Sequence, residues 1–327
     1  EISVRRRESL LRRLLPVLLL TAAAGVRAQP ALDPGLEAYA PGADLRGTLT
    51  SVGSDTMLGL MERWLAGFAR LHPDVEVSLE AEGSATAPAA LLEGTAMLGP
   101  MSRRMHASEI ARFQRRFGHR PTGFRVAVDA LAVFVHADNP IAGLTLPEVD
   151  AIFSSTRRCG RFEAVDRWGQ LGLDGAWQER PVQRFGRNSV SGTHGYFRDA
   201  ALCGGEFEDS LVELPNSAAL VEAVAADSGA IGYAGIGYQS PGVRAVPIAR
   251  RPGAAFVDVT GANAVDGLYP LSRYLYIYVD RPPDASPAPI TRAFLRYVLS
   301  AAGQAVVLRE GYVPLPAKVV RRERALL

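Results

Sequence analysis

The chain has 327 residues, of which 48% are hydrophobic and 21% are charged, a composition typical of a soluble globular protein. Its length exceeds that of one ordinary hydrophobic core, so we expect two domains or lobes. The formal net charge of +2 at pH 7 argues against nucleic acid as a partner, because nucleic-acid affinity depends on many cationic contacts to phosphates.

The N-terminal residues have the pattern of a secretory signal peptide. Several arginines precede the apolar run Leu14–Ala24, and small residues follow it as far as Ala28. This run is shorter than the roughly 20 apolar residues of a membrane span. We therefore predict a cleavable signal peptide over residues 1–28, with cleavage near Ala28 and export to the periplasm.

The chain after the signal peptide predicts a leader and then a strand-helix-strand unit. Residues 29–44 are rich in Pro, Gly and Ala and predict a loose leader. A short strand begins at Leu49 and ends in the turn Gly53–Thr56. Apolar residues then recur with helical spacing over Met57–Phe68, and Val75–Leu79 alternates as a strand does.

Two more strand-to-helix junctions carry a serine. Ser84 precedes the helical segment Pro88–Leu92, and the expected short strand Ala96–Gly99 leads through Ser102 to the expected helix Ser108–Phe117. Strands that alternate with helices predict a mostly parallel sheet, whose ligands bind at the carboxyl ends of the strands. The serines therefore stand where a ligand would meet the beginnings of helices.

Two long apolar strands are expected to cross between the lobes, Arg125–Val135 and, returning, Tyr269–Val279. Between them, Thr145–Glu148 has the pattern of a capping box that opens the helix Val149–Phe153. Residues 154–180 lack periodicity and predict an irregular surface excursion.

One stretch after the strand Pro181–Phe185 predicts an anion site. Arg187 precedes the turn Ser191-Gly192-Thr193, and Ser191 is a natural N-cap for a helix over Tyr196–Leu202. A helix N-terminus offers free N–H groups and partial positive charge, to which this stretch adds hydroxyls and a guanidinium. Alone, the turn is more typical of an ordinary helix cap with Arg187 as a surface charge; the repeated hydroxyl residues at earlier junctions favour the anion site.

The remaining elements complete an α/β chain. We expect helices over Ser217–Ala226, Ile290–Ser300 and Gly303–Arg309, and a glycine-rich strand over Ala230–Tyr238. Residues 239–264 predict strand and loop.

The two cysteines, Cys159 and Cys203, predict a disulfide bond, because an exported protein matures in an oxidising compartment. Neither cysteine lies at metal-ligand spacing from a histidine, so we expect no metal site and no cofactor. Catalysis by Ser191 with His194 as its base is the enzymatic alternative. It lacks a third residue to orient the imidazole, so we expect no enzyme activity.

Five motifs in this order resemble the phosphate-binding proteins of high-affinity phosphate ABC importers, the PstS type of periplasmic binding protein. These motifs are Gly53–Met57, Glu82–Ser84, Pro100–Arg103, Arg187–Thr193 and Ala230–Tyr238. The similarity covers roughly Leu49 to Pro316. It implies a type II periplasmic-binding fold, with two α/β lobes joined by two hinge strands and the ligand cleft between them. One lobe would combine residues 45–125 with 271–327, and the other would span 126–270.

The resemblance implies a monomer that binds inorganic phosphate and delivers it to the permease subunits of an ABC transporter. Carried over by position, the phosphate-binding residues are Ser54, Asp55, Thr56, Ser84, Ser102, Arg187, Ser189, Ser191, Gly192 and Thr193. The alternatives are another tetrahedral oxyanion as ligand, and an anion sensor or scavenger without a transporter.

Two positions depart from the best-known members, which have aspartate where this chain has Ser102 and Ser189. A carboxylate only accepts hydrogen bonds, so it distinguishes HPO₄²⁻, which has a proton to donate, from SO₄²⁻, which has none. Asp55 remains as a carboxylate in the first ligand loop. Beside Ser102, Arg103 and Arg104 either add positive potential at the cleft mouth or form a solvated helix start.

Overall fold

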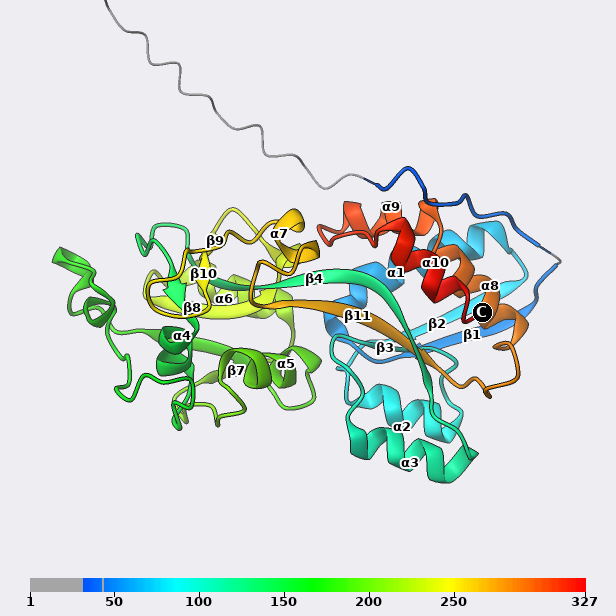
Figure 1. Ribbon diagram of the computed structural model, residues 1–327, viewed down its shortest axis with the longest axis horizontal. Coiled ribbons are helices and arrows are strands. Elements are labelled where there is room, and N and C mark those ends of the chain that lie inside the picture. Colours follow the sequence, from blue (N-terminus) through cyan, green and yellow to red (C-terminus); the bar gives the residue numbers. More distant parts are fainter. Residues whose placement is uncertain (1–31, 43) are drawn as a thin grey trace, which may run out of the picture.

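The computed structural model describes residues 32–42 and 44–327, so the predicted signal peptide over residues 1–28 lies outside the described residues. The described chain is a mixed α/β structure with two lobes arranged along the longest axis of the molecule (Figure 1). Two long strands run between the lobes, β4 (Thr122–His136) and β11 (Ser272–Val279). They correspond to the two crossing strands that the sequence predicts.

Each lobe alternates strands with helices. Lobe 1 contains η1 (Asp55–Met57), β1 (Gly47–Val52), β2 (Val75–Glu80), β3 (Gly99–Met101), α1 (Leu58–Leu71), α2 (Thr86–Glu93), α3 (Ala107–Phe117), α8 (Pro289–Val298), α9 (Ala301–Arg309) and α10 (Ala317–Arg324). Lobe 2 contains β5 (Leu144–Thr145), α4 (Leu146–Phe153), η2 (Trp168–Leu171), η3 (Gly175–Trp177), β6 (Gln183–Arg187), α5 (Gly192–Ala201), β7 (Val212–Leu214), α6 (Ser217–Ala226), β8 (Ala230–Gly235), η4 (Ile236–Tyr238), β9 (Val243–Ala245), β10 (Ile248–Ala249) and α7 (Gly261–Val265).

The main sheet is mixed, with the strand order β3-β11-β4-β8-β6-β7 and β9 paired to β4. Strands β4 and β11 pair antiparallel to each other, and β4 also pairs antiparallel to β8. Parallel pairing occurs between β1 and β2 and between β6 and its neighbours β7 and β8. The expectation of a mostly parallel sheet is therefore wrong for the main sheet. The reason is that the chain crosses between the lobes once in each direction, which makes the two crossing strands antiparallel.

Helix α1 shows how the sequence pattern produces the core of lobe 1. Its apolar stripe is buried, including Leu60, Trp64 and Phe68, each with no exposed surface. The Trp64 indole N–H donates to the carbonyl of Gly303 in α9 at 2.8 Å, so its one polar group is satisfied. The stripe therefore packs α1 against the C-terminal helices.

Several boundaries differ from the expectation. The strand expected over Ala96–Gly99 begins later in the chain, as β3 (Gly99–Met101). Before β3, Leu98 makes an isolated bridge to Ser51. Helix α5 begins at Gly192, a turn earlier than Tyr196, because the Ser191 hydroxyl caps it by accepting from the Thr193 N–H at 3.2 Å.

The capping box before α4 is present as predicted. The Glu148 carboxylate accepts from the Thr145 N–H at 2.8 Å, and the Thr145 hydroxyl accepts from the Glu148 N–H at 3.3 Å. Two of the free donors at the helix start are therefore paired.

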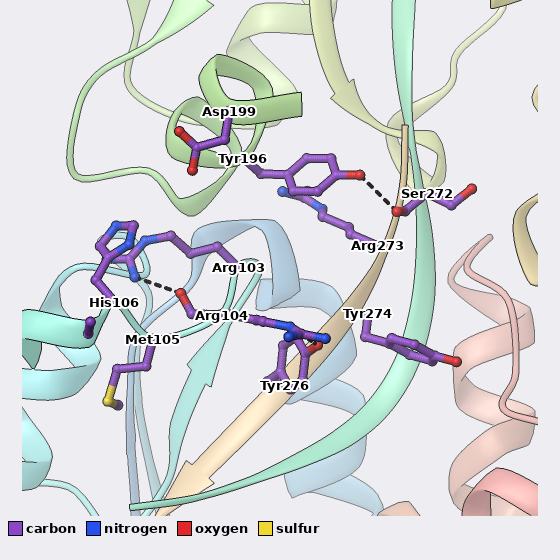
Figure 2. A pocket seen from close by; sticks show the side chains of 11 residues that line it. Arg103, Arg104, Met105, His106, Tyr196, Asp199, Ser272, Arg273, Tyr274 and Tyr276 are labelled. Carbon is purple, nitrogen blue, oxygen red and sulfur yellow. Dashed lines mark hydrogen bonds between the residues drawn. The ribbon is translucent and has the colours of Figure 1, made fainter. Parts of the chain in front are cut away.

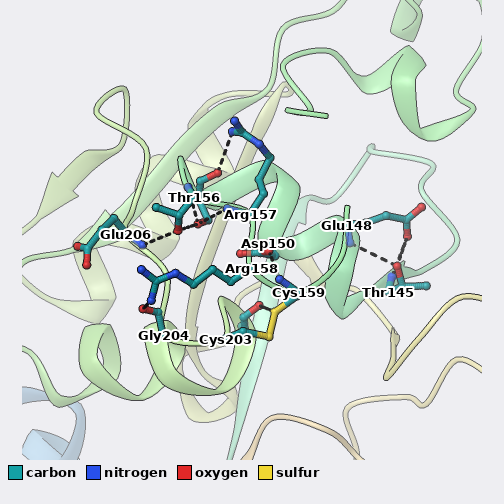
Figure 3. The surroundings of a disulfide bond; sticks show 12 residues. Thr145, Glu148, Asp150, Thr156, Arg157, Arg158, Cys159, Cys203, Gly204 and Glu206 are labelled. Atoms are coloured by element: carbon teal, nitrogen blue, oxygen red, sulfur yellow. Dashed lines mark hydrogen bonds between the residues drawn. A yellow bond between two sulfur atoms is a disulfide. The ribbon is translucent and has the colours of Figure 1, made fainter. Parts of the chain in front are cut away.

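A disulfide bond joins Cys159 to Cys203 (Figure 3). It links the irregular segment 154–180 to the residues that follow α5. The Cys159 N–H also donates to the Asp150 carboxylate on α4 at 2.7 Å. The disulfide bond and this hydrogen bond therefore connect the segment to the residues after α5 and to α4.

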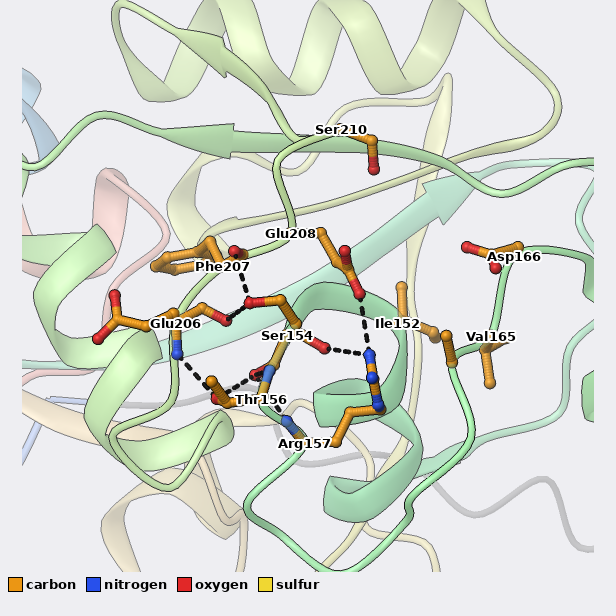
Figure 4. A network of polar contacts seen from close by, with 12 residues as sticks. Ile152, Ser154, Thr156, Arg157, Val165, Asp166, Glu206, Phe207, Glu208 and Ser210 are labelled. Carbon is orange, nitrogen blue, oxygen red and sulfur yellow. Dashed lines mark hydrogen bonds and ion pairs between the residues drawn. The ribbon is translucent and has the colours of Figure 1, made fainter.

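Polar contacts hold the start of the same segment against residues 206–208 (Figure 4). The Arg157 guanidinium donates to the Glu208 carboxylate at 3.1 Å and to the Ser154 carbonyl at 3.2 Å. The Glu206 N–H donates to the Thr156 hydroxyl at 3.0 Å. The segment contains only the short 3-10 helices η2 and η3, and these contacts fix its start against residues 206–208.

Residues 32–42, within the predicted leader, form no helix or strand but contact lobe 1. The Asp33 carboxylate accepts from the Ala317 N–H at 2.8 Å, and the Glu37 carbonyl accepts from the Ala301 N–H at 2.8 Å. This part of the chain is therefore anchored to the first turns of α9 and α10. None of the helices in the described residues is long and apolar enough to cross a membrane.

Candidate ligand-binding site

The first loop of the site follows β1. Its residues Ser54, Asp55 and Thr56 are all buried. Two tyrosines fix the backbone of this loop: Tyr238 donates to the Asp55 carbonyl at 3.1 Å, and Tyr312 donates to the Thr56 carbonyl at 2.7 Å. Because Tyr238 belongs to lobe 2 and Tyr312 to the C-terminal part of lobe 1, the loop is held from both sides.

The second and third loops bring two serines together. Ser84 follows β2 and Ser102 follows β3, and neither side chain has exposed surface. Their hydroxyl oxygens lie 3.2 Å apart, and the Ser102 N–H donates to the Ser84 hydroxyl at 3.0 Å. The pair packs tightly against Gly192 of lobe 2, where an added Cβ would lie 2.2 Å from the Ser84 hydroxyl oxygen.

Arg187 and Asp55 form a buried ion pair between the lobes, with 2.7 Å between Nη1 and Oδ2. Arg187 ends β6, and its guanidinium also donates to the carbonyls of Leu214 and Pro215 and to the hydroxyl of Ser217. Four contacts to protein therefore occupy most of the five N–H donors of this guanidinium.

Two further contacts join the lobes beside the ion pair. The hydroxyl oxygens of Thr56 and Thr193 lie 2.8 Å apart. The Ala85 N–H, just before α2, donates to the Val190 carbonyl at 3.1 Å. The beginnings of α2 and α5 thus meet at the same place, which is the arrangement that stabilises a bound anion.

Nine of the ten residues that the sequence assigns to the site are buried where the lobes meet: Ser54, Asp55, Thr56, Ser84, Ser102, Arg187, Ser191, Gly192 and Thr193. The tenth, Ser189, is exposed and lies outside this group. It follows the end of β6 by two residues, and the turn that leads into α5 directs it to solvent.

The sequence analysis missed a second buried ion pair, between Arg273 on β11 and Asp129 on β4. Arg273 donates to the Asp129 Oδ2 from Nε at 2.9 Å and from Nη2 at 2.7 Å. Nη2 also donates to the Thr193 hydroxyl at 2.9 Å, which connects this pair to the site. The signal for it was present, because each residue is a charge within an otherwise apolar strand.

Four buried polar atoms of the site and of the adjoining Arg273–Asp129 pair have no hydrogen-bond partner among the described residues: the Ser54 hydroxyl oxygen, Asp55 Oδ1, Asp129 Oδ1 and Arg273 Nη1. Buried polar atoms are nearly always paired in folded proteins, so such a set calls for an explanation. A small anion that both accepts and donates hydrogen bonds matches them, because the set contains a cationic donor, a carboxylate acceptor and a hydroxyl.

A cavity of ≈ 520 Å³ lies beside the site, with walls from both lobes and from β11 (Figure 2). Tyr196 reaches from α5 to the Ser272 carbonyl at 2.8 Å; burial raises the pKa of Tyr196 to about 12, so its hydroxyl stays a donor. Arg273 lines this cavity as well as touching Thr193. The cavity therefore adjoins the buried group through one side chain.

Arg103 and Arg104 also line the cavity but differ in exposure. Arg103 is buried and pairs with Glu109 at 2.7 Å, whereas Arg104 is exposed and its Nε donates to the Tyr276 hydroxyl at 3.2 Å. Of the two, Arg104 is the one whose charge faces solvent at this cavity.

His194 does not form a catalytic pair in this arrangement. Its ring packs on Phe207 with 4.5 Å between the centroids, and burial, together with the charges of Arg198 and Arg187, lowers its pKa to about 4. The Ser191 hydroxyl is engaged in capping α5. Among the described residues, no three His, Cys, Asp or Glu side chains are grouped so as to hold a metal ion.

Two α/β lobes, two connecting strands and a buried polar group between the lobes define a solute-binding protein of the periplasmic-binding type. The family model of the PBP superfamily domain matches residues 38–302. Over 314 residues the chain is 50% identical to the phosphate-binding protein PstS of Pseudomonas aeruginosa, which covers 95% of this chain and 97% of that protein. The chain belongs to the PBP superfamily and, within it, to the PstS family of phosphate-binding proteins.

More distant proteins resemble the chain in sequence or in structure. Protein SphX of Synechococcus elongatus is 28% identical over 278 residues, or 84% of this chain and 79% of that protein. The crystal structure of an ABC-type phosphate transport receptor from Vibrio cholerae superposes with a TM-score of 0.63 at 22% identity, covering 82% of this chain and all of that chain. At this identity the structural likeness supports the type II periplasmic-binding fold.

Proposed function

We propose that this protein captures inorganic phosphate between its lobes in the periplasm and delivers it to the permease subunits of an ABC importer. The observation that carries the proposal is the buried group at which both lobes meet, with the Ser54 hydroxyl and Asp55 Oδ1 unpartnered. The phosphate-binding names of relatives such as the PstS proteins of Pseudomonas aeruginosa and Bacillus subtilis support the same ligand.

The proposed binding residues are the nine buried ones, and the exposed Ser189 is left out. Arg187 supplies positive charge, although its donors are mostly engaged with protein, and the hydroxyls and the N–H groups at the starts of α2 and α5 supply hydrogen bonds. Hydrogen bonds to charged groups contribute about 1.5–3 kcal/mol each, so a few suffice for micromolar affinity.

Asp55 is the proposed determinant of selectivity. Its Oδ2 is held by Arg187, and its Oδ1 is left to accept a hydrogen bond. HPO₄²⁻ has a proton to donate to this oxygen, whereas SO₄²⁻ would meet it with unpaired negative charge. This geometry favours phosphate over the alternative of another tetrahedral oxyanion without a proton.

Binding and lobe closure make up the whole proposed activity, with no bond made or broken, and the protein acts as a monomer. We place the lobe boundaries at 45–125 with 271–327, and at 126–270. With these boundaries the chain passes from one lobe to the other twice, once within β4 and once immediately before β11. The alternative role, as a sensor or scavenger without a transporter, predicts normal phosphate uptake after deletion of the gene.

Isothermal titration calorimetry tests the proposed ligand. The protein is unfolded, dialysed free of phosphate and refolded, then titrated separately with phosphate and with sulfate. We expect micromolar or tighter binding of phosphate and at least tenfold weaker binding of sulfate. Equal binding of the two anions, or binding of neither, would remove the phosphate assignment.

A further inference from the structure

We propose that Arg273 is a second cationic ligand of the bound anion and that Asp129 is its positioning residue. This inference rests on the proposed function, because it names a further residue of the same site. It concerns a part of the chain outside all the loops that the sequence motifs mark, namely the two strands that connect the lobes.

The position of the Arg273 guanidinium follows from three contacts. Two of its nitrogens donate to Asp129 Oδ2, at 2.9 and 2.7 Å, and Nη2 also donates to the Thr193 hydroxyl at 2.9 Å. The Thr193 hydroxyl in turn lies 2.8 Å from that of Thr56. The guanidinium therefore sits one hydroxyl away from the first ligand loop.

Arg273 retains more unused donor capacity than Arg187. Its Nη1 is buried and has no hydrogen-bond partner among the described residues, whereas Arg187 makes four contacts to protein groups. The Tyr196 ring lies 5.2 Å from the guanidinium carbon of Arg273 and covers it on one side (Figure 2). This covering limits solvent access, so a charge-assisted bond from Nη1 to an anion would form in a low-dielectric surrounding.

Asp129 accounts for the orientation of Arg273. The two residues are directly opposite each other in the antiparallel register of β4 and β11, and Asp129 has no exposed surface. Because two guanidinium nitrogens donate to the same Asp129 oxygen, the pair restricts the directions in which the guanidinium can point. An anion bound to Arg273 would thus be linked to both crossing strands as well as to the loops of the two lobes.

A pair of variants tests the proposal by calorimetry with inorganic phosphate. Arg273→Gln alone leaves Asp129 buried and unpaired, so the double variant Arg273→Gln/Asp129→Asn, which removes both charges, is the informative one. We expect the double variant to bind phosphate about 10- to 100-fold more weakly than the parent protein, the loss of one charged hydrogen bond. Arg251→Gln, which removes an exposed arginine of lobe 2, is the control and is expected to bind as the parent does.

The outcomes separate this inference from the proposed function. If Arg273 only neutralises Asp129, the double variant recovers the affinity of the parent, and the proposal is overturned while the phosphate assignment stands. If the parent binds neither phosphate nor sulfate, both are overturned. Thermal unfolding of the ligand-free double variant checks that it folds. The variant Arg273→Lys, made with Asp129 intact, keeps the positive charge but loses the planar guanidinium. We expect its phosphate affinity to lie between those of the parent protein and the double variant.

Discussion

Asp55 and Arg187 join the two lobes through an ion pair with 2.7 Å between Oδ2 and Nη1, and both side chains are buried. Removal of one partner from a buried pair leaves an uncompensated charge and typically costs about 3–5 kcal/mol. The pair therefore links the stability of the closed arrangement to the charges that face the ligand.

Substitution of Asp55 by asparagine should weaken the selection of phosphate over sulfate. An asparagine amide offers N–H donors that sulfate can accept, and it removes negative charge from the site. We expect the ratio of the phosphate and sulfate affinities to fall at least tenfold, measured by calorimetry with each anion. An unchanged ratio would show that Asp55 does not set the selectivity.

Arg187→Ala should lower phosphate affinity and stability together. The change removes four hydrogen bonds and leaves Asp55 without its partner. We expect phosphate affinity to fall at least tenfold and the free energy of unfolding in urea to fall by about 3–5 kcal/mol. Wild-type affinity in this variant would mean that Arg187 is not a countercharge for the ligand.

Gly192→Ala should oppose closure of the lobes. A Cβ at Gly192 would lie 2.2 Å from the Ser84 hydroxyl oxygen and 2.7 Å from the Ser84 Cβ, distances that real Cβ atoms do not tolerate. Gly195→Ala is a matched control in the same helix, because its Cβ would make only ordinary contacts with the Arg103 side chain, at 3.5 Å from Cδ and 3.9 Å from Nε.

The measurements for this pair are phosphate affinity by calorimetry and the radius of gyration by small-angle X-ray scattering. We expect weaker binding and a larger radius with phosphate for Gly192→Ala, and values like the parent protein for Gly195→Ala. Parent-like closure in Gly192→Ala would contradict the tight packing of α5 against the serine pair.

Loss of the disulfide should destabilise lobe 2 without changing the ligand site. The bond spans 44 residues of sequence, and in the chain-entropy model closure of such a loop contributes about 4 kcal/mol. We expect Cys159→Ser/Cys203→Ser to lower the free energy of unfolding by up to about that amount and to keep phosphate affinity within about twofold of the parent. Equal urea unfolding curves for the two proteins would refute this expectation.

His194 should make the protein less stable in mild acid. Burial lowers its pKa from 6.5 to about 4, so the unfolded chain takes up a proton there before the folded chain does. The stabilisation that comes from uncharged His194 is therefore fully present above pH 6.5 and is lost as the pH falls toward 4. We expect the free energy of unfolding to fall less over this range in His194→Gln than in the parent, as measured by urea titrations; parallel pH profiles would exclude the effect.

Local sequence patterns predicted those helices and strands whose structure is determined by residues close together in the sequence. The apolar stripe of α1 and the capping box at Thr145 and Glu148 are examples, because helical periodicity and cap chemistry act within a few residues. The strand order and its mixed direction were not predictable in this way, because pairing joins residues far apart in the chain. Helix α10, rich in charged residues, was missed for lack of a long apolar stripe.

The site shows the same division. The hydroxyl residues at the strand-to-helix junctions were found because the chain direction at those junctions follows from the local pattern. Ser189 and Arg187 are two residues apart, yet only Arg187 is buried, since the turn between β6 and α5 has no periodicity from which side-chain direction follows. Arg273 and Asp129 were missed because their contact depends on the register of β11 against β4.

The anchoring of residues 33–37 onto the first turns of α9 and α10 puts the start of the described chain and its C-terminus on one lobe (Figure 1). A fluorophore, surface tether or fusion partner attached near residue 33 or near the C-terminus would therefore be attached to lobe 1 alone. Lobe 2 would then remain free to move relative to lobe 1, so we expect protein immobilised in this way to close around its ligand as the free protein does.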